Sequence, residues 1–179
     1  AIINEGFVTY GGMSGRDLEA LAIGLYEGVE EDYLEYRINQ VAYLGEQLAK
    51  KGVPIILPTG GHGVYVDAQK FYPNIPQSEF PGQAMVVELF KTGGVRGVEL
   101  GSCAFSKKNP ETGKIIFPDL ELVRLTVSRR VYTNRHMDVV VNALADVFER
   151  RNEMKGLKLI YEGPIISLRH FTAKFEPIS

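Results

Sequence analysis

The chain has 179 residues, which is long enough for one compact domain with a buried core or for a large part of a bigger protein. Its net charge of −2 and its 45% apolar content are typical of a soluble globular protein, so we expect no general binding to nucleic acid or to anionic membranes. The single cysteine, Cys103, excludes an internal disulfide and indicates a reducing compartment, and no apolar run approaches the roughly 20 residues of a membrane span. We therefore expect a cytoplasmic protein.

The first half of the chain is predicted to be helical and then rich in strands. Apolar residues recur at helical spacing between residues 16 and 52, which predicts two helices, or one long bent helix, ending near Gly52. The runs VPIILP and GVYVDA flank the residues TGGH and predict a strand, a turn and a second strand. A third helix is predicted from about Gln83 to Lys91, with Thr92-Gly93-Gly94 as its end.

The second half alternates strands and one strong helix. VRGVEL and ELVRLTV read as strands joined by the polar loop SKKNPETGK, and LKLIYE and SLRHFTAKF read as two further extended segments. HMDVVVNALADVFERRNEM is an amphipathic helix with Thr133 or Asn134 as its candidate cap. These elements predict an α+β fold in which helices pack on a small, mainly antiparallel sheet.

Several residues that could carry chemistry have a simpler structural explanation. His62 lies among glycines and His136 opens a helix, but no histidine pair has metal-ligand spacing, so structural roles are favoured for both. Cys103 follows a strand-like run and is interpreted as a buried, inert thiol. The stretch YGGMSGRD precedes a helix as phosphate-binding loops do, but it lacks the order of residues found in such loops.

Arg124 is the most informative charged residue, because it stands between Val123 and Leu125 in an apolar strand. Two interpretations remain open. The side chain can point to the solvent face of the strand, or its planar fork, fixed by the strand, can bind a substrate carboxylate through two hydrogen bonds. Arg129 and Arg130, at the strand end, are interpreted as surface or interface charges.

Several motifs along the chain carry a family resemblance. In this order, NEGFVTYGG, GRDLEALAIGL, YRINQVAYLG, PTGGHGVYVDA, VRGVELGS, VRLTVSRRVYT, HMDVV and LRHFTAKF resemble the C-terminal part of the β-eliminating lyases. These are the pyridoxal-phosphate enzymes tryptophanase (tryptophan indole-lyase) and tyrosine phenol-lyase. The resemblance covers essentially the whole chain, whereas Tyr65 stands where relatives often have phenylalanine and VSRR replaces the commoner I-P-R.

The resemblance implies the small C-terminal domain of a fold type I pyridoxal-phosphate enzyme. Residues 1–50 would be a helical segment connecting from a missing N-terminal cofactor domain, and residues 51–179 the small α/β domain. The start of the sequence, AIINEGF without methionine, also favours a C-terminal part. The lysine that binds the cofactor would lie upstream in an S-G-K-K-type motif that this chain lacks, so the chain alone is expected to be inactive. A homotetramer and a potassium ion are expected from the family, with no potassium ligand assigned here.

The same resemblance implies roles for individual residues. Arg124 matches the arginine that binds the substrate carboxylate. Leu100 stands where phenol-lyases carry an arginine suited to the phenol oxygen, and His170-Phe171 matches the H-F of tryptophanases rather than the F-F of phenol-lyases. Both positions favour L-tryptophan as the substrate, with His170 supporting proton transfer beside the indole ring and Phe171 packing against it. Phe7 and Tyr10 match positions that approach a neighbouring subunit's site.

Two alternatives remain at this point. One is tyrosine phenol-lyase, which shares most of the quoted motifs. The other is a free-standing, non-catalytic binding or assembly module.

Overall fold

The computed structural model describes residues 13–178. The chain divides into two compact units, residues 1–37 and 38–179. The described part of the first unit holds helix α2 (Gly15–Glu27) and the beginning of helix α3 (Glu31–Lys50). The predicted pair of helices is therefore confirmed, and Gly52 follows α3 with a positive φ of 76°. Residues 1–12, including Phe7 and Tyr10, lie outside the described part.

Helix α2 begins after Ser14, whose hydroxyl donates to the Asp17 carboxylate at 2.7 Å. None of its residues is buried. The exposed apolar side chains of this helix are Leu18, Leu21, Ile23, Leu25 and Tyr26. No helix among residues 13–178 is both long enough and apolar enough to cross a membrane.

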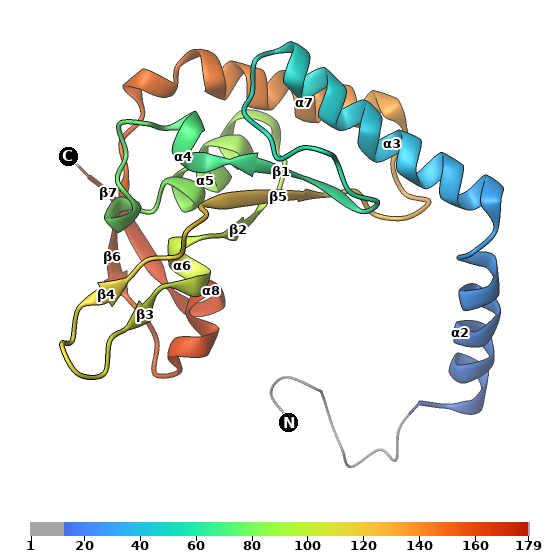
Figure 1. Ribbon diagram of the computed structural model, residues 1–179, viewed down its shortest axis with the longest axis horizontal. Helices are drawn as coiled ribbons and strands as arrows, with labels where there is room; N and C mark the ends of the chain where they lie inside the picture. The colour runs from blue at the N-terminus through green and yellow to red at the C-terminus, as the bar shows by residue number, and fades with distance from the viewer. Residues whose placement is uncertain (1–12, 179) are drawn as a thin grey trace. The chain divides into compact units, whose positions relative to one another are not determined.

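The second unit is built on a three-stranded antiparallel sheet with the order β1-β5-β2 (Figure 1). Strand β5 (Leu122–Thr126) lies in the centre and pairs with β1 (Gly63–Asp67) on one side and β2 (Val98–Leu100) on the other. Because side chains alternate along a strand, Val64, Val66 and Val123 point to one face and are buried, while Tyr65 and Arg124 point to the other. The sheet thus has one core face and one more open face.

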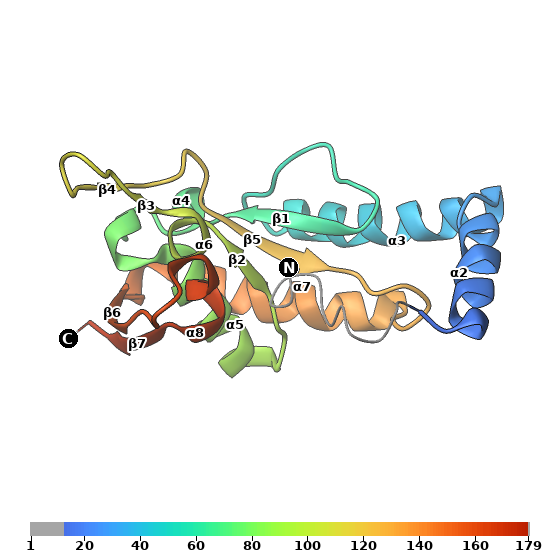
Figure 2. The same cartoon turned by 90° about the horizontal axis from the view of Figure 1, so that it is seen from below.

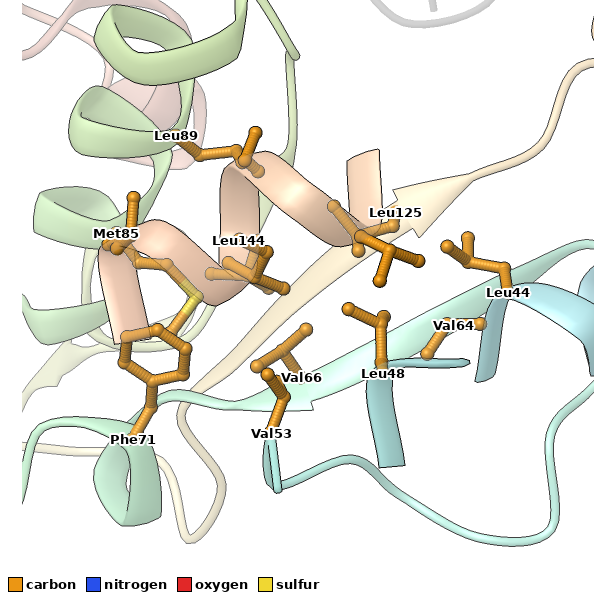
Figure 3. Close-up of a cluster of buried hydrophobic side chains, with 14 of the residues drawn as sticks. Leu44, Leu48, Val53, Val64, Val66, Phe71, Met85, Leu89, Leu125 and Leu144 are labelled. Atoms are coloured by element: carbon orange, nitrogen blue, oxygen red, sulfur yellow. The ribbon is translucent and has the colours of Figure 1, made fainter. Parts of the chain in front are cut away.

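Three helices supply the core on the buried face. Residues 38–50 of α3, α5 (Pro81–Gly93) and α7 (Asn134–Glu149) contribute buried apolar side chains that meet those of the sheet, and Figure 3 shows the cluster at close range. Helix α5 starts with Pro81, whose missing N–H costs nothing at that position, and ends at Gly94 with φ +66°. Thr133 precedes α7, as predicted. Labelled members of the cluster include Leu44, Leu48, Met85, Leu89, Leu125 and Leu144.

Figure 2 shows the same strands from the side away from α7, with β5 and β2 in front of that helix. Beside β2 lie two short elements, α6 (Ser102–Phe105) and α8 (Arg169–Thr172), which contact each other. The remaining elements are α4 (Ala68–Phe71), the 3-10 turns η2 (Gln77–Glu79), η3 (Arg151–Glu153) and η4 (Ile166–Leu168), the hairpin β3 (Lys107–Lys108) and β4 (Ile115–Ile116), and the ribbon β6 (Leu157–Tyr161) and β7 (Lys174–Pro177).

The predicted α+β fold with a mainly antiparallel sheet is confirmed, but two predicted strands need correction. VPIILP makes only an isolated bridge, Ile55 with Val66, because Pro54 and Pro58 have no N–H to donate to a ladder. SLRHFTAKF was predicted to be extended throughout. Only Lys174–Pro177 forms a strand, whereas residues 166–172 form a 3-10 turn and the helix α8.

Candidate functional site

The open face of the sheet carries Arg124 at its centre. Arg124 lies opposite Tyr65 on β1 and Val98 on β2, so the three side chains form a row across the sheet. The Arg124 side chain is half-buried, and its Nε is buried without a hydrogen-bond partner among residues 13–178. A buried guanidinium N–H without an acceptor is costly, so this position suits an oxygen ligand brought by another molecule or another part of the protein.

Leu100 lies on the same open face as Arg124. It ends β2, pairs with Leu122, and stands two residues beyond Val98, the partner of Arg124. Because residues two apart on a strand share a face, the half-buried Leu100 is a near neighbour of the arginine. The structure therefore places a guanidinium and an apolar side chain on one surface.

Tyr65 and His62 also belong to this surface, although the sequence analysis assigned neither of them to a site. The Tyr65 hydroxyl lies 3.1 Å from Nε2 of His62, and Tyr65 faces Arg124 across the β1–β5 pair. The signal was present in the sequence, since the alternation of Val64, Tyr65 and Val66 puts the tyrosine on the face opposite the core. His62 was interpreted as structural; its ring contacts a tyrosine side chain.

His170 and Phe171 lie elsewhere, on helix α8. Their rings are 3.8 Å apart between centroids, and both side chains are exposed, Phe171 by 77%. They line a pocket of about 520 Å³ with Val98 and Glu99 of β2 and with residues of α5 such as Val87. Arg124 and Leu100 do not line this pocket, so the structure does not bring Arg124 and His170 together in it. The pocket and the open face meet at Val98.

Arg169, which precedes His170, is the best connected side chain of the region and was missed in the sequence. Its Nε donates to the carbonyl of Cys103 at 2.7 Å, and its Nη2 donates to the carbonyls of Ser102 at 2.9 Å and Ser106 at 3.2 Å. Its Nη1 donates to a Glu162 carboxylate oxygen at 2.7 Å. The guanidinium is thereby fixed at the C-terminal end of α6.

Two carboxylates fix the opposite end of α6. Glu99 accepts hydrogen bonds from the backbone N–H groups of Cys103 and Ala104, both at 2.9 Å. Glu121 accepts from the N–H of Ser102 at 2.9 Å and from its hydroxyl at 2.5 Å. A Cβ at Gly101 would lie 2.4 Å from the Glu121 carboxylate, so only glycine fits this approach.

Glu99 and Glu121 are both buried, and burial changes the acidity of Glu99. Burial, and to a smaller degree the charge of Glu121, raise the pKa of Glu99 from its ordinary 4.5 to about 7, although the N–H groups of Cys103 and Ala104 lower it. Burial also raises the pKa of the Cys103 thiol to about 12, which agrees with the inert thiol predicted from the sequence.

The raised pKa of Glu99 predicts a pH dependence of stability. Between about pH 4.5 and 7 the folded chain holds a proton at Glu99 that the unfolded chain has released, so this group's contribution to the free energy of unfolding falls as the pH rises, by at most about 3 kcal/mol. Denaturant unfolding of the wild-type chain and of Glu99→Gln from pH 5 to 8 checks this. We expect the wild type to lose stability relative to the variant; a pH-independent difference would contradict the raised pKa of Glu99.

His136 has the structural role that was favoured for it. Its Nδ1 accepts a hydrogen bond from the backbone N–H of Thr133 at 3.1 Å, at the start of α7. Across residues 13–178, no group of three or more His, Cys, Asp or Glu side chains is arranged to hold a metal ion.

A model of the family described as "Beta-eliminating lyase" matches residues 19–143. The chain belongs to the β-eliminating lyase family. Among relatives of this family, the tyrosine phenol-lyase of Symbiobacterium sp. (strain SC-1) is 52% identical over 178 residues, which is 99% of this chain and 38% of the relative.

Other members of the β-eliminating lyase family match equally widely. The probable tryptophanase of Aeropyrum pernix is 51% identical over 178 residues, which is 99% of this chain and 38% of that protein. The tryptophanase of Salinibacter ruber is 49% identical over 176 residues, covering 98% of this chain and 36% of that protein. This chain thus spans little more than a third of the length of these relatives. Relatives of both names stand at similar identity, so identity alone does not choose the substrate.

Proposed function

We propose that this chain is the C-terminal part of a pyridoxal-phosphate-dependent tryptophan indole-lyase, which converts L-tryptophan to indole, pyruvate and ammonia. The observation that supports it most is the open sheet face, where Arg124 has an unsatisfied buried Nε and Leu100 presents an apolar side chain nearby. An amino-acid substrate has a carboxylate for the first and, in tryptophan, a ring without oxygen for the second.

The cofactor itself does not fit the residues of this chain. Every lysine in the sequence is exposed, and Lys91, the one that lines the pocket beside His170, is paired with Glu88 at 2.7 Å. In the proposal, pyridoxal phosphate is held by the rest of a full-length protein and supplies an electron sink when bound. Residues 1–50 then connect from that cofactor domain, residues 51–179 form the small domain, and the chain alone is inactive. A homotetramer and a potassium ion belong to the same proposal.

Each residue of the proposed site has a defined task. The fork of Arg124 holds the substrate carboxylate through two parallel hydrogen bonds and so fixes the orientation of the α-carbon. Leu100 packs against the indole ring, where a polar group would lack a partner. Phe171 adds apolar contact, and the exposed imidazole of His170 carries or relays the proton that the ring must gain before it leaves.

The substrate of the full-length protein tests the proposal directly. With pyridoxal phosphate and L-tryptophan we expect release of indole, and with L-tyrosine a much slower release of phenol. Both products are measured by chromatography after equal incubation.

Tyrosine phenol-lyase is the second candidate, supported by relatives of that name at 52% identity. Cleavage of tyrosine with tryptophan left intact would establish it and overturn the argument from Leu100 and His170. A protein that cleaves neither amino acid would favour the free-standing binding or assembly module.

A further inference from the structure

The connection between β2 and α8 runs through polar groups. Helix α6 follows β2 directly, with only Gly101 between Leu100 and the first residue of the helix. Its N–H groups bond to the buried carboxylates of Glu99 and Glu121, and its carbonyl end bonds to Arg169. Because both ends are fixed by buried side chains, α6 is a rigid link between the end of β2 and the start of α8.

Helix α8 has few other supports. It is four residues long, Phe171 and His170 are exposed, and its contacts with other elements are chiefly those with α6 and the preceding η4 turn. Thr172 adds hydrogen bonds to the Glu162 carbonyl at 3.1 Å and the Leu168 carbonyl at 3.2 Å. A helix of this length does not persist by itself, so the buried Arg169, only 6% exposed, largely determines where α8 lies.

We propose that Arg169 is a positioning residue that fixes His170 and Phe171 relative to Leu100, and so helps to set which ring the enzyme accepts. This deepens the proposed function and depends on it. The guanidinium reaches three carbonyls and one carboxylate from a single plane, which the point charge of a lysine ammonium does not reproduce. Arg169→Lys therefore keeps the charge while releasing most of the hydrogen bonds.

The first test compares two substrates of the full-length protein. Loss of indole from tryptophan needs proton transfer to the ring, whereas loss of chloride from β-chloroalanine does not. In Arg169→Lys we expect kcat for tryptophan to fall about 10-fold, since misplacement of a positioned group by about 1 Å has effects of this size or larger, with kcat for β-chloroalanine changed less than about 2-fold. Equal losses for both substrates, or no loss for either, would overturn the proposal.

The matched control is Arg151→Lys. The Arg151 guanidinium also donates to a backbone carbonyl, that of Phe148 at 2.8 Å, but it lies in η3, away from α8. Its kcat values should equal those of the wild type for both substrates.

A second test does not require turnover. NMR spectra of the 179-residue chain report the amide resonances of α8 and the ring resonances of His170. In Arg169→Lys these resonances should shift or broaden while those of buried Leu144 and Val123 stay in place, and unchanged α8 resonances would overturn the positioning role. If the wild-type enzyme cleaves neither tryptophan nor tyrosine, the proposed function fails, and the NMR result alone decides the structural part of this inference.

Discussion

Replacing Arg124 by glutamine is expected to reduce kcat/KM of the full-length enzyme for L-tryptophan about 100- to 1,000-fold. Glutamine removes the two charge-assisted hydrogen bonds that we assign to the substrate carboxylate, each of which contributes about 1.5–3 kcal/mol. The carboxylate would still approach the sheet but would no longer fix the α-carbon. Steady-state rates of indole release over a range of tryptophan concentrations measure the effect.

Two further variants test whether the effect is specific to the guanidinium of Arg124. Arg124→Lys keeps the positive charge and should lie between glutamine and the wild type, since an ammonium forms no fork. Arg129→Gln removes an exposed arginine in the turn that follows β5 and should leave kcat/KM unchanged. An Arg124→Gln enzyme with wild-type kcat/KM would show that Arg124 merely faces solvent.

Replacing Leu100 by arginine is expected to lower indole release about 100-fold. The new guanidinium would stand near Arg124 on the open face and would face a ring that offers no oxygen, so it would lose water without gaining an acceptor, at a cost of about 1–3 kcal/mol, and like-charge repulsion adds to this. Phenol release from tyrosine should rise only slightly, because one substitution seldom transfers a specificity. Parallel assays with both amino acids measure the two changes.

The control for this substitution is Leu120→Arg. Leu120 is an exposed leucine that precedes β5, and an arginine there should leave both activities at wild-type values. An enzyme with arginine at position 100 that released indole at the wild-type rate would exclude Leu100 from the ring-binding surface.

Local patterns predicted most of the fold. The helices α3, α5 and α7 follow from apolar spacing and from stop or cap residues such as Gly94 and Thr133, and β1, β2 and β5 follow from short apolar runs. The prediction failed where partners distant in sequence decide the conformation. The run SLRHFTAKF largely alternates polar and apolar residues like a strand, yet residues 169–172 within it form a helix whose first side chain bonds to carbonyls more than sixty residues earlier.

The residues of the candidate site were likewise only partly predictable from the sequence. Arg124 could be placed on the open face by its alternation with Val123 and Leu125, once the strand was assigned, whereas the same rule puts Leu100 on the core face. Glu99 could not be placed, because its flanking apolar residues Val98 and Leu100 suggest that the glutamate faces water. In the structure it faces the core, where the N–H groups of α6 and the neighbouring Glu121 accommodate it. These hydrogen-bond donors surround the Glu99 carboxylate only when the chain is folded.

The burial of the only cysteine has a practical consequence for measuring this site. Cys103 is 1% exposed and its thiol stays protonated at neutral pH, so maleimide reagents should leave it unmodified in the folded chain. A cysteine introduced at an exposed position of α8 can therefore carry a fluorescent or spin label without first removing the native one. The signal of such a label would report the movement of this short helix directly, in solution and during turnover.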